Sequence, residues 1–181
     1  MKTALVLVDI QNDYFPGGKN ELYKAEDAAE AAREILRIFR ARAWPVFHIR
    51  HIAGGDGATF FLPDTSGSEI AKLVSPLPSE EVFIKHAPNS FIGTPLGAAL
   101  TNLRIERIVI AGMMSHMCID STTRAASELG FEVLLVHDAC TTKALVFQAE
   151  VIPALQVHAA FMAGLGSFAR VVSLEELKEL L

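Results

Sequence analysis

The chain has 181 residues, of which 51% are hydrophobic, and its formal net charge is −5. This length suits one domain with a sizeable core. Acidic and basic residues are interspersed, so no basic stripe indicates a nucleic acid and no polybasic run indicates an anionic membrane as partner. No apolar stretch approaches the roughly 20 residues that span a bilayer, and we expect a soluble protein.

Apolar runs alternate with segments of helical period along the chain. We expect strands at residues 4–9, 45–50, 81–85, 107–112, 132–138 and 169–172. We expect helices at residues 26–42, from about 118 to 129 and from Pro153 to about 165, and a Ser-x-x-Glu capping box at residues 173–176 that opens a last helix. This alternation predicts an α/β fold with a mostly parallel six-stranded sheet, formed by residues 1–181 as a single domain. Residues 51–67 and 85–95 lack such periodicity, and loops this long are usually functional or subunit-forming.

Three reactive side chains follow the ends of expected strands: Asp9, Lys85 and Cys118. In a doubly wound sheet the functional site lies beyond the carboxyl ends of the strands. A carboxylate can accept the thiol proton, an ammonium can favour both anions, and the thiolate can attack a carbonyl carbon, which together is what covalent acyl transfer needs. A thiol at the start of a helix, near a lysine, is also expected to have a lowered pKa.

Three segments carry a resemblance to a known family. They are "LVLVDIQNDYFPGG" near the start, "KHAPNSF" at residues 85–91, and "AGMMSHMCIDSTTRAASELGFEVLLVHDAC" at residues 111–140. In this order they resemble the isochorismatase-like cysteine hydrolases, of the isochorismatase/nicotinamidase-like superfamily; the middle segment matches the family's K-x-x-x-S-x-F pattern with a shift of one residue. The resemblance implies a three-layer α/β/α Rossmann-like fold and a catalytic triad of Asp9, Lys85 and Cys118.

The resemblance also implies the local structure around the nucleophile. A cis peptide bond is expected between Met113 and Met114, and the backbone N–H groups of Met114 and Cys118 are expected to form the oxyanion hole. The activity it implies is that of an amidohydrolase, which cleaves a C–N bond of a small amide or ureido substrate through a thioester and needs no cofactor.

Other side chains near the expected site have competing interpretations. Tyr14 and Phe91 are candidates for a pocket wall, and His116 is balanced between substrate contact and a solvated turn. The remaining residues fit structural roles at least as well as functional ones: Gln11 and Asp13 as capping residues, Phe60 and Phe61 in packing, Cys140 as a structural thiol, and His158 as a buried histidine with a hydrogen-bond partner.

A metal centre is not expected. His48 and His51 are three residues apart near the end of a strand, where odd spacing points side chains to opposite faces. Nicotinamidases, which belong to the family that this sequence resembles, carry an Asp-x-His metal pair just past this strand. The matching positions here are His51 and Ala53, so the carboxylate and one imidazole are missing. An atypical site that uses His48 or His51 stays open.

Other functions compete with the cysteine hydrolase. A dinucleotide-binding domain would need G-x-G-x-x-G after the first strand, where "DIQNDYF" stands. A haloacid-dehalogenase-type phosphatase would need a second Asp at Gln11. Isochorismatases that cleave a vinyl ether have a similar fold but lack the cysteine nucleophile. A catalytically silent oligomeric scaffold is the alternative that is not an enzyme, and it would not need Asp9, Lys85 and Cys118.

Composition also indicates where and how the protein acts. A mean hydropathy of +0.33 hints at surface buried between subunits, so we expect a homo-oligomer, a dimer or tetramer, with residues 51–67 and the helix after Pro153 as contact surfaces. Two cysteines are too few for a disulfide framework, which favours the reducing cytoplasm.

Overall fold

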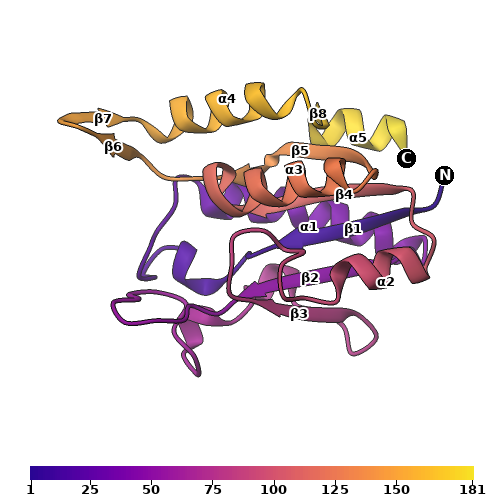
Figure 1. Cartoon of the computed structure of the whole chain (residues 1–181), viewed down its shortest axis with the longest axis horizontal. Coiled ribbons are helices and arrows are strands. Elements are labelled where there is room, and N and C mark those ends of the chain that lie inside the picture. The colour runs from indigo at the N-terminus through magenta and orange to yellow at the C-terminus, as the bar shows by residue number, and fades with distance from the viewer.

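The computed structural model describes all residues from Met1 to Leu181. Its main sheet has six strands in the order β3-β2-β1-β4-β5-β8, and every neighbouring pair is parallel. The strands are β1 (Thr3–Val8), β2 (Val46–His51), β3 (Glu81–Lys85), β4 (Arg107–Met113), β5 (Glu132–Thr141) and β8 (Arg170–Val172). Strand order reverses direction beside β1, so the carboxyl ends of β1 and β4 flank the position where this fold class places its site (Figure 1).

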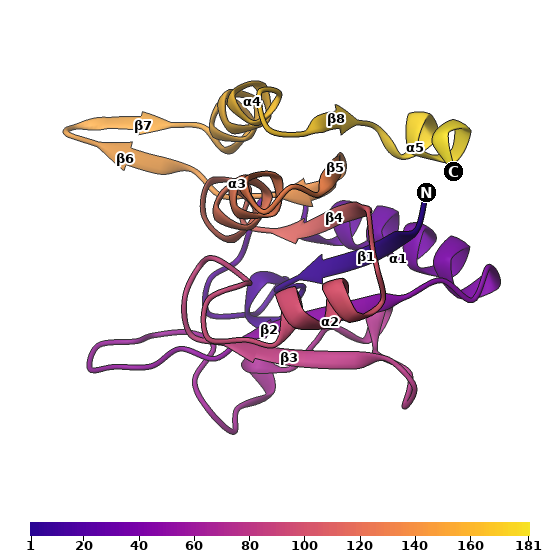
Figure 2. The ribbon, with the colours of Figure 1, turned by 45° about the vertical axis from the view of Figure 1, so that its right-hand side comes forward.

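Helices cover both faces of the sheet (Figure 2). They are α1 (Ala25–Ala41), α2 (Leu96–Asn102), α3 (Asp120–Glu128), α4 (Ala154–Leu165) and α5 (Leu174–Leu180). The apolar side chains of α1 and α5 pack with Leu5 and Leu7 of β1, and those of α2, α3 and α4 belong to the cluster of Val6 and Val8. Because β1 is covered on both faces, all six of its residues are buried. This arrangement confirms the three-layer α/β/α fold.

A two-stranded antiparallel hairpin stands outside these layers. It consists of β6 (Leu145–Phe147) and β7 (Glu150–Ile152), and both ribbon views show it extending well beyond the layered body, on the side toward which the β1 arrow points (Figures 1 and 2). It follows directly from the carboxyl end of β5 and leads into α4. The sequence pattern did not predict this hairpin, nor the short helix α2.

Four differences between the expected and the observed element boundaries concern residues named above. Strand β5 continues to Thr141, three residues further than expected, so Cys140 lies inside it and is buried. A π-helical turn (Ser115–Ile119) precedes α3, so Cys118 lies within this turn and not at the first residue of the helix. Pro153 is the N-cap of α4 and not its first helical residue. Strand β1 ends at Val8, so Asp9 follows it. The capping box of Ser173 and Glu176 is confirmed.

Short 3-10 helices interrupt the irregular segments at Asn12–Tyr14, Ser66–Ser68 and Lys72–Val74. None of the helices combines the length and apolar character that a membrane crossing requires.

Candidate active site

The structure brings Asp9, Lys85 and Cys118 together at the carboxyl edge of the sheet. The ammonium Nζ of Lys85 lies 2.8 Å from Oδ2 of Asp9 and 3.2 Å from Sγ of Cys118. The Asp9 and Lys85 side chains are fully buried, and Cys118 is 6% exposed. The Asp9 carboxylate has no conventional hydrogen-bond partner, so the Lys85 ammonium is its charge partner, and a buried carboxylate without one would be costly.

Close approach of two strands sets the position of Asp9. The residue follows β1 with a left-handed backbone, φ 52°, a conformation that Asp tolerates better than most residues. In the adjacent strand Gly112 has φ 139°, and a Cβ there would lie 2.0 Å from the carbonyl oxygen of Val8. Only glycine therefore lets β4 pass β1 at this point, directly before the catalytic candidate Asp9.

Backbone hydrogen bonds to Met114 stabilise the turn that carries Cys118. The peptide bond between Met113 and Met114 is cis. The Met114 carbonyl accepts hydrogen bonds from the N–H groups of Met117 at 3.0 Å and Ile119 at 3.2 Å, whereas the Met114 N–H donates to no group of the chain. A free backbone donor beside the thiol can bind a developing negative charge.

Two histidines brace the same turn. Nδ1 of His158, on α4, hydrogen-bonds to Oγ of Ser115 at 2.8 Å, so this residue is a histidine with a partner, as the sequence suggested. Nδ1 of His116 bonds to Oγ1 of Thr142 at 2.5 Å. Burial lowers the pKa values of both histidines, so both are neutral near neutral pH. Contact of His116 with substrate stays a prediction.

Burial dominates the electrostatics of the site. It raises the pKa of Asp9, against the lowering effect of Lys85. It also raises the pKa of Cys118, and the Asp9 carboxylate adds to this, against the lowering effect of Lys85. The expected lowering of the thiol pKa is therefore wrong, because desolvation and a neighbouring anion outweigh the ammonium. The resting thiol is protonated, and the Asp9 carboxylate lies within 4.8 Å of it.

Aromatic side chains close one side of the site. Tyr14 is 2% exposed and its ring centroid lies 4.5 Å from that of Phe61. Burial and the nearby charge of Asp9 raise the pKa of Tyr14 well above its usual range. Phe60 and Phe61 pack edge to face, 5.0 Å apart. The ring of Phe91 stacks on Phe131, and its pocket role stays a prediction.

The polar residues after β1 have anchoring contacts. The Asp13 carboxylate accepts hydrogen bonds from the backbone N–H of Phe61 at 2.7 Å and of Lys19 at 3.2 Å. A Cβ at Gly67 would lie 2.2 Å from the same carboxylate, so Asp13 fastens the loop of residues 59–67 tightly against its own segment. The expected capping role is wrong for Gln11, which is the N-cap residue of the 3-10 helix at Asn12–Tyr14 but makes no capping hydrogen bond with its side chain. Asp13 lies inside that helix, and its carboxylate anchors the neighbouring loop instead.

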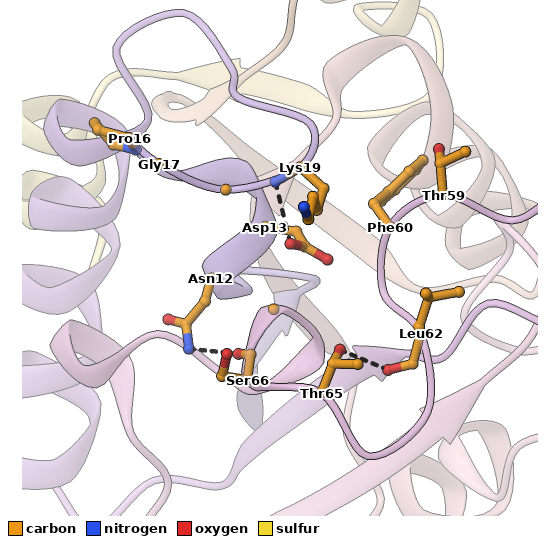
Figure 3. A pocket seen from close by; sticks show the side chains of 12 residues that line it. Asn12, Asp13, Pro16, Gly17, Lys19, Thr59, Phe60, Leu62, Thr65 and Ser66 are labelled. Atoms are coloured by element: carbon orange, nitrogen blue, oxygen red, sulfur yellow. Dashed lines mark hydrogen bonds between the residues drawn. The ribbon is translucent and has the colours of Figure 1, made fainter.

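A cavity of about 370 Å³ lies between these two loops (Figure 3). Its lining is mostly polar, and none of the three triad candidates contributes to it; the lining residues are Asn12, Asp13, Pro16, Gly17, Gly18, Lys19, Thr59, Phe60, Leu62, Thr65, Ser66 and Gly67. Two of the lining residues contact the Tyr14–Phe61 pair: Phe60 packs near Tyr14, and Asp13 accepts the hydrogen bond from Phe61.

His48 and His51 take up different positions. Nε2 of His48 bonds to Glu80 at 2.9 Å, whereas Nδ1 of His51 lies 3.1 Å from Nζ of Lys85. Polar atoms of Asp9, His51 and Cys118 lie within 4.8 Å of one another, a spacing that a metal ion could bridge. The Lys85 ammonium contacts all three groups, so a positively charged side chain already occupies the position where a metal ion would bind them. Sequence reasoning missed the place of His51 in this cluster.

A family model, a curated relative and a solved structure each align with nearly the whole length of this chain. A model of the isochorismatase domain matches residues 3–176. An uncharacterised isochorismatase family protein of Bacillus subtilis, YddQ, is 48% identical over 176 residues, 97% of this chain and 98% of its own. The crystal structure of an isochorismatase-type hydrolase from Oleispira antarctica has a TM-score of 0.93 at 47% identity, and the alignment covers 97% of this chain and 95% of that one.

Two further similar proteins have a described activity. Streptothricin hydrolase of Streptomyces noursei is 33% identical over 139 residues, which are 77% of this chain and 54% of that protein. The structure of N-carbamoylsarcosine amidase from Thermoplasma acidophilum has a TM-score of 0.80 at 25% identity and covers 96% of this chain and 97% of that one.

Proposed function

The chain belongs to the isochorismatase family of hydrolases, and from this premise we propose that it cleaves a C–N bond of a small amide or ureido compound through a thioester on Cys118. One observation carries the proposal: a single buried ammonium, Lys85, contacts both a carboxylate and a thiol. Such a trio has the base, the nucleophile and the balancing charge that acyl transfer requires. The similar amidase and streptothricin hydrolase support this substrate class.

The first half-reaction begins with proton transfer. Asp9 takes the proton of the Cys118 thiol, and the sulfur attacks the substrate carbonyl carbon to form a tetrahedral intermediate. Lys85 remains charged and stabilises the sulfur as the carboxylate becomes neutral. The backbone N–H groups of Met114 and Cys118 bind the oxyanion; removing one such donor in other enzymes costs about 3–4 kcal/mol.

The intermediate then breaks its C–N bond. Asp9 returns the proton to the leaving nitrogen, which departs as the amine or ammonia, and the acyl group stays on Cys118 as a thioester. In the second half-reaction Asp9 removes a proton from water, the hydroxide attacks the thioester carbonyl, and the C–S bond breaks. The acid leaves, and the proton on Asp9 restores the thiol.

Because the resting thiol is protonated, the thiolate forms only as the substrate is attacked. Tyr14, Phe91 and His116 are the proposed substrate contacts. A panel of small amides and ureido compounds, screened for ammonia or amine release by the wild type and by Cys118→Ala, tests the proposal. We expect at least one substrate that only the wild type turns over; release at equal rates by both proteins would contradict the nucleophilic role.

We also propose that the protein works as a homo-oligomer. Residues 145–169 carry one charged side chain, Glu150, whereas 20% of the whole chain is charged. In this segment Val146, Phe147, Val151 and Leu155 are 60–70% exposed. A chain of net charge −5 repels its own copies elsewhere, so an uncharged apolar surface fits a second copy, which meets it with the same patch across a two-fold axis.

Three narrower proposals concern the context. The chain acts as a single domain, which the match of one family model to residues 3–176 supports. No metal or other cofactor takes part in the steps above. Cys118 and Cys140 are both free thiols, which suits the reducing cytoplasm.

A further inference from the structure

His51 contacts the residue that balances charge in the proposed mechanism. It ends β2, directly beside Lys85 at the end of β3 in the parallel register. Its Nδ1 lies 3.1 Å from Nζ of Lys85. The same ammonium lies 3.0 Å from the carbonyl oxygen of Ala87, 2.8 Å from Asp9 and 3.2 Å from Cys118. Three N–H bonds of one ammonium thus face four acceptors.

The contact fixes the protonation of the imidazole. An ammonium has three donors and no acceptor, so Nδ1 of His51 must accept and any ring proton must sit on Nε2. Burial and then the charge of Lys85 lower the pKa of His51 to about 4. Two of the ammonium's N–H bonds therefore go to neutral acceptors, His51 and the Ala87 carbonyl. The third is directed at Sγ of Cys118, while the charge of the ammonium balances the Asp9 carboxylate.

A buried amide holds the His51 backbone in place. Oε1 of Gln11 accepts a hydrogen bond from the His51 N–H at 2.7 Å, and Nε2 of Gln11 donates to the His51 carbonyl at 2.8 Å. Nε2 also donates to the carbonyl of Ser68 at 2.8 Å. The Gln11 side chain is fully buried, and its amide pairs with His51 as a neighbouring strand would.

We propose that His51 is a positioning residue, which holds the Lys85 ammonium through Nδ1 so that one N–H bond points at Sγ of Cys118 while the ammonium balances the charge of Asp9. This inference deepens the proposed function and rests on it for the role of Lys85. Without the imidazole acceptor a buried ammonium is less well solvated, and it stabilises the thiolate less well.

The environment of the imidazole contains few other charges. Lys85, His86, Asp9 and Cys118 are the titratable groups that face it from β3, the segment after β3, β1 and the nucleophile turn. His86 bonds through Nδ1 to the carbonyl of Ile52, at the surface. The effect of changing His51 should therefore be transmitted to the thiol through Lys85.

A matched pair of variants separates this role from simple packing. His51→Asn retains an oxygen near the place of Nδ1 and can accept from Lys85. His51→Phe keeps an aromatic ring that can pack near Phe61, whose ring centroid lies 6.1 Å from that of His51, but it has no acceptor. The readout is the rate of alkylation of Cys118 by iodoacetamide over a series of pH values. This measurement needs no substrate, so it stands apart from the test of the hydrolase activity. Cys140, which is buried and has no contact with Lys85, reports any general loosening of the fold.

We expect alkylation of Cys118 in His51→Phe to be about tenfold slower than in the wild type, because a hydrogen bond to a charged group is lost. In His51→Asn we expect it to stay within about threefold of the wild type, with Cys140 unchanged in both. Wild-type rates in His51→Phe, or equal slowing in both variants with folding intact, would overturn the proposal. Faster Cys140 labelling in His51→Phe alone would also overturn it, because His51 would then act through packing.

Discussion

Two regions of the molecule break the usual rule of burial in opposite ways. The cluster of Asp9, Lys85 and Cys118 buries charged side chains, whereas the hairpin and α4 expose apolar ones. At the carboxyl edge of the sheet, Asp9 and Lys85 are ions without solvent exposure. A short distance along the chain, Val146 and Phe147 are apolar side chains that are 70% and 67% exposed. Both arrangements cost stability in an isolated chain, since buried ions lose hydration and exposed apolar surface gains nothing from folding.

The difference indicates two kinds of function. The buried ions are balanced within the chain, because the ammonium and the carboxylate lie 2.8 Å apart, and we propose a chemical role for them. The apolar side chains of the hairpin are exposed in the single chain, and in our proposal a second copy covers them. Helix α4, which follows the hairpin, meets the turn that carries Cys118 through His158, which connects the two regions.

The largest effects should come from removing the reactive groups. Cys118→Ala leaves no nucleophile, and Asp9→Asn leaves the thiol without a base. Each should lower kcat by several orders of magnitude with the fold retained, and the double variant should be little worse than either single one, because these residues act as a unit. Steady-state kinetics with circular dichroism as a folding control measure this. Additive losses in the double variant would show that the two residues act independently.

The next largest effect is expected from disturbing the contact between β4 and β1 at Gly112 and Val8, directly before Asp9. Gly112→Ala would place a Cβ 2.0 Å from the Val8 carbonyl oxygen at a backbone φ of 139°, and we expect it to lower the free energy of unfolding by about 3 kcal/mol or more. Gly54→Ala is the matched control, because no atom lies within 4 Å of its added Cβ. Urea denaturation of both variants compares them; equal midpoints would contradict the tight approach of β4 to β1.

The buried imidazole predicts a pH dependence of stability. The pKa of His51 is lowered from 6.5 to about 4, so the folded state binds this proton less readily than the unfolded state does. Its contribution is fully present above pH 6.5 and is lost as pH falls toward 4, a change of about 3 kcal/mol at most. Other histidines with lowered pKa values act in the same direction, so the test is the difference between wild type and His51→Asn in unfolding free energy over this range. Parallel curves would contradict the neutral, acceptor state of His51.

The hairpin surface should be separable from the chemistry of the cluster. Replacing Val146 and Phe147 by Ser removes apolar surface that we assign to a second copy, and sedimentation at micromolar concentration should show a smaller species than the wild type. Ile92→Ser is the control, since Ile92 is 58% exposed on another loop. A wild type that is already monomeric, or a double variant with unchanged mass, would remove the assignment.

The smallest expected effect is that of a chelator. Because the Lys85 ammonium already contacts Asp9, His51 and Cys118, activity should be unchanged after exhaustive treatment with EDTA. Loss of turnover that zinc restores would show that a metal ion displaces the ammonium from this cluster.

Much of the fold could be predicted because continuous apolar runs such as residues 4–8 mark strands that are covered on both faces. The hairpin was missed because its turn has no glycine or asparagine: Gln148 takes the positive φ of 54°, where those residues usually give the signal. The triad candidates follow from their places at strand ends. The position of His51 does not, because its contact with Lys85 depends on the pairing register of β2 and β3, which the sequence does not contain. The raised thiol pKa depends on burial, which is equally absent from it.

The central claim is that Cys118 carries the acyl group during turnover, with Asp9 as base. The most direct test is mass spectrometry of the Cys118 peptide after rapid acid quenching of the enzyme with a substrate found in the amide screen. The account predicts an added acyl mass on Cys118 in the wild type, none on Cys140, and no adduct or turnover in Cys118→Ala. Full turnover by Cys118→Ala, with no acyl mass on the wild-type peptide, would contradict it.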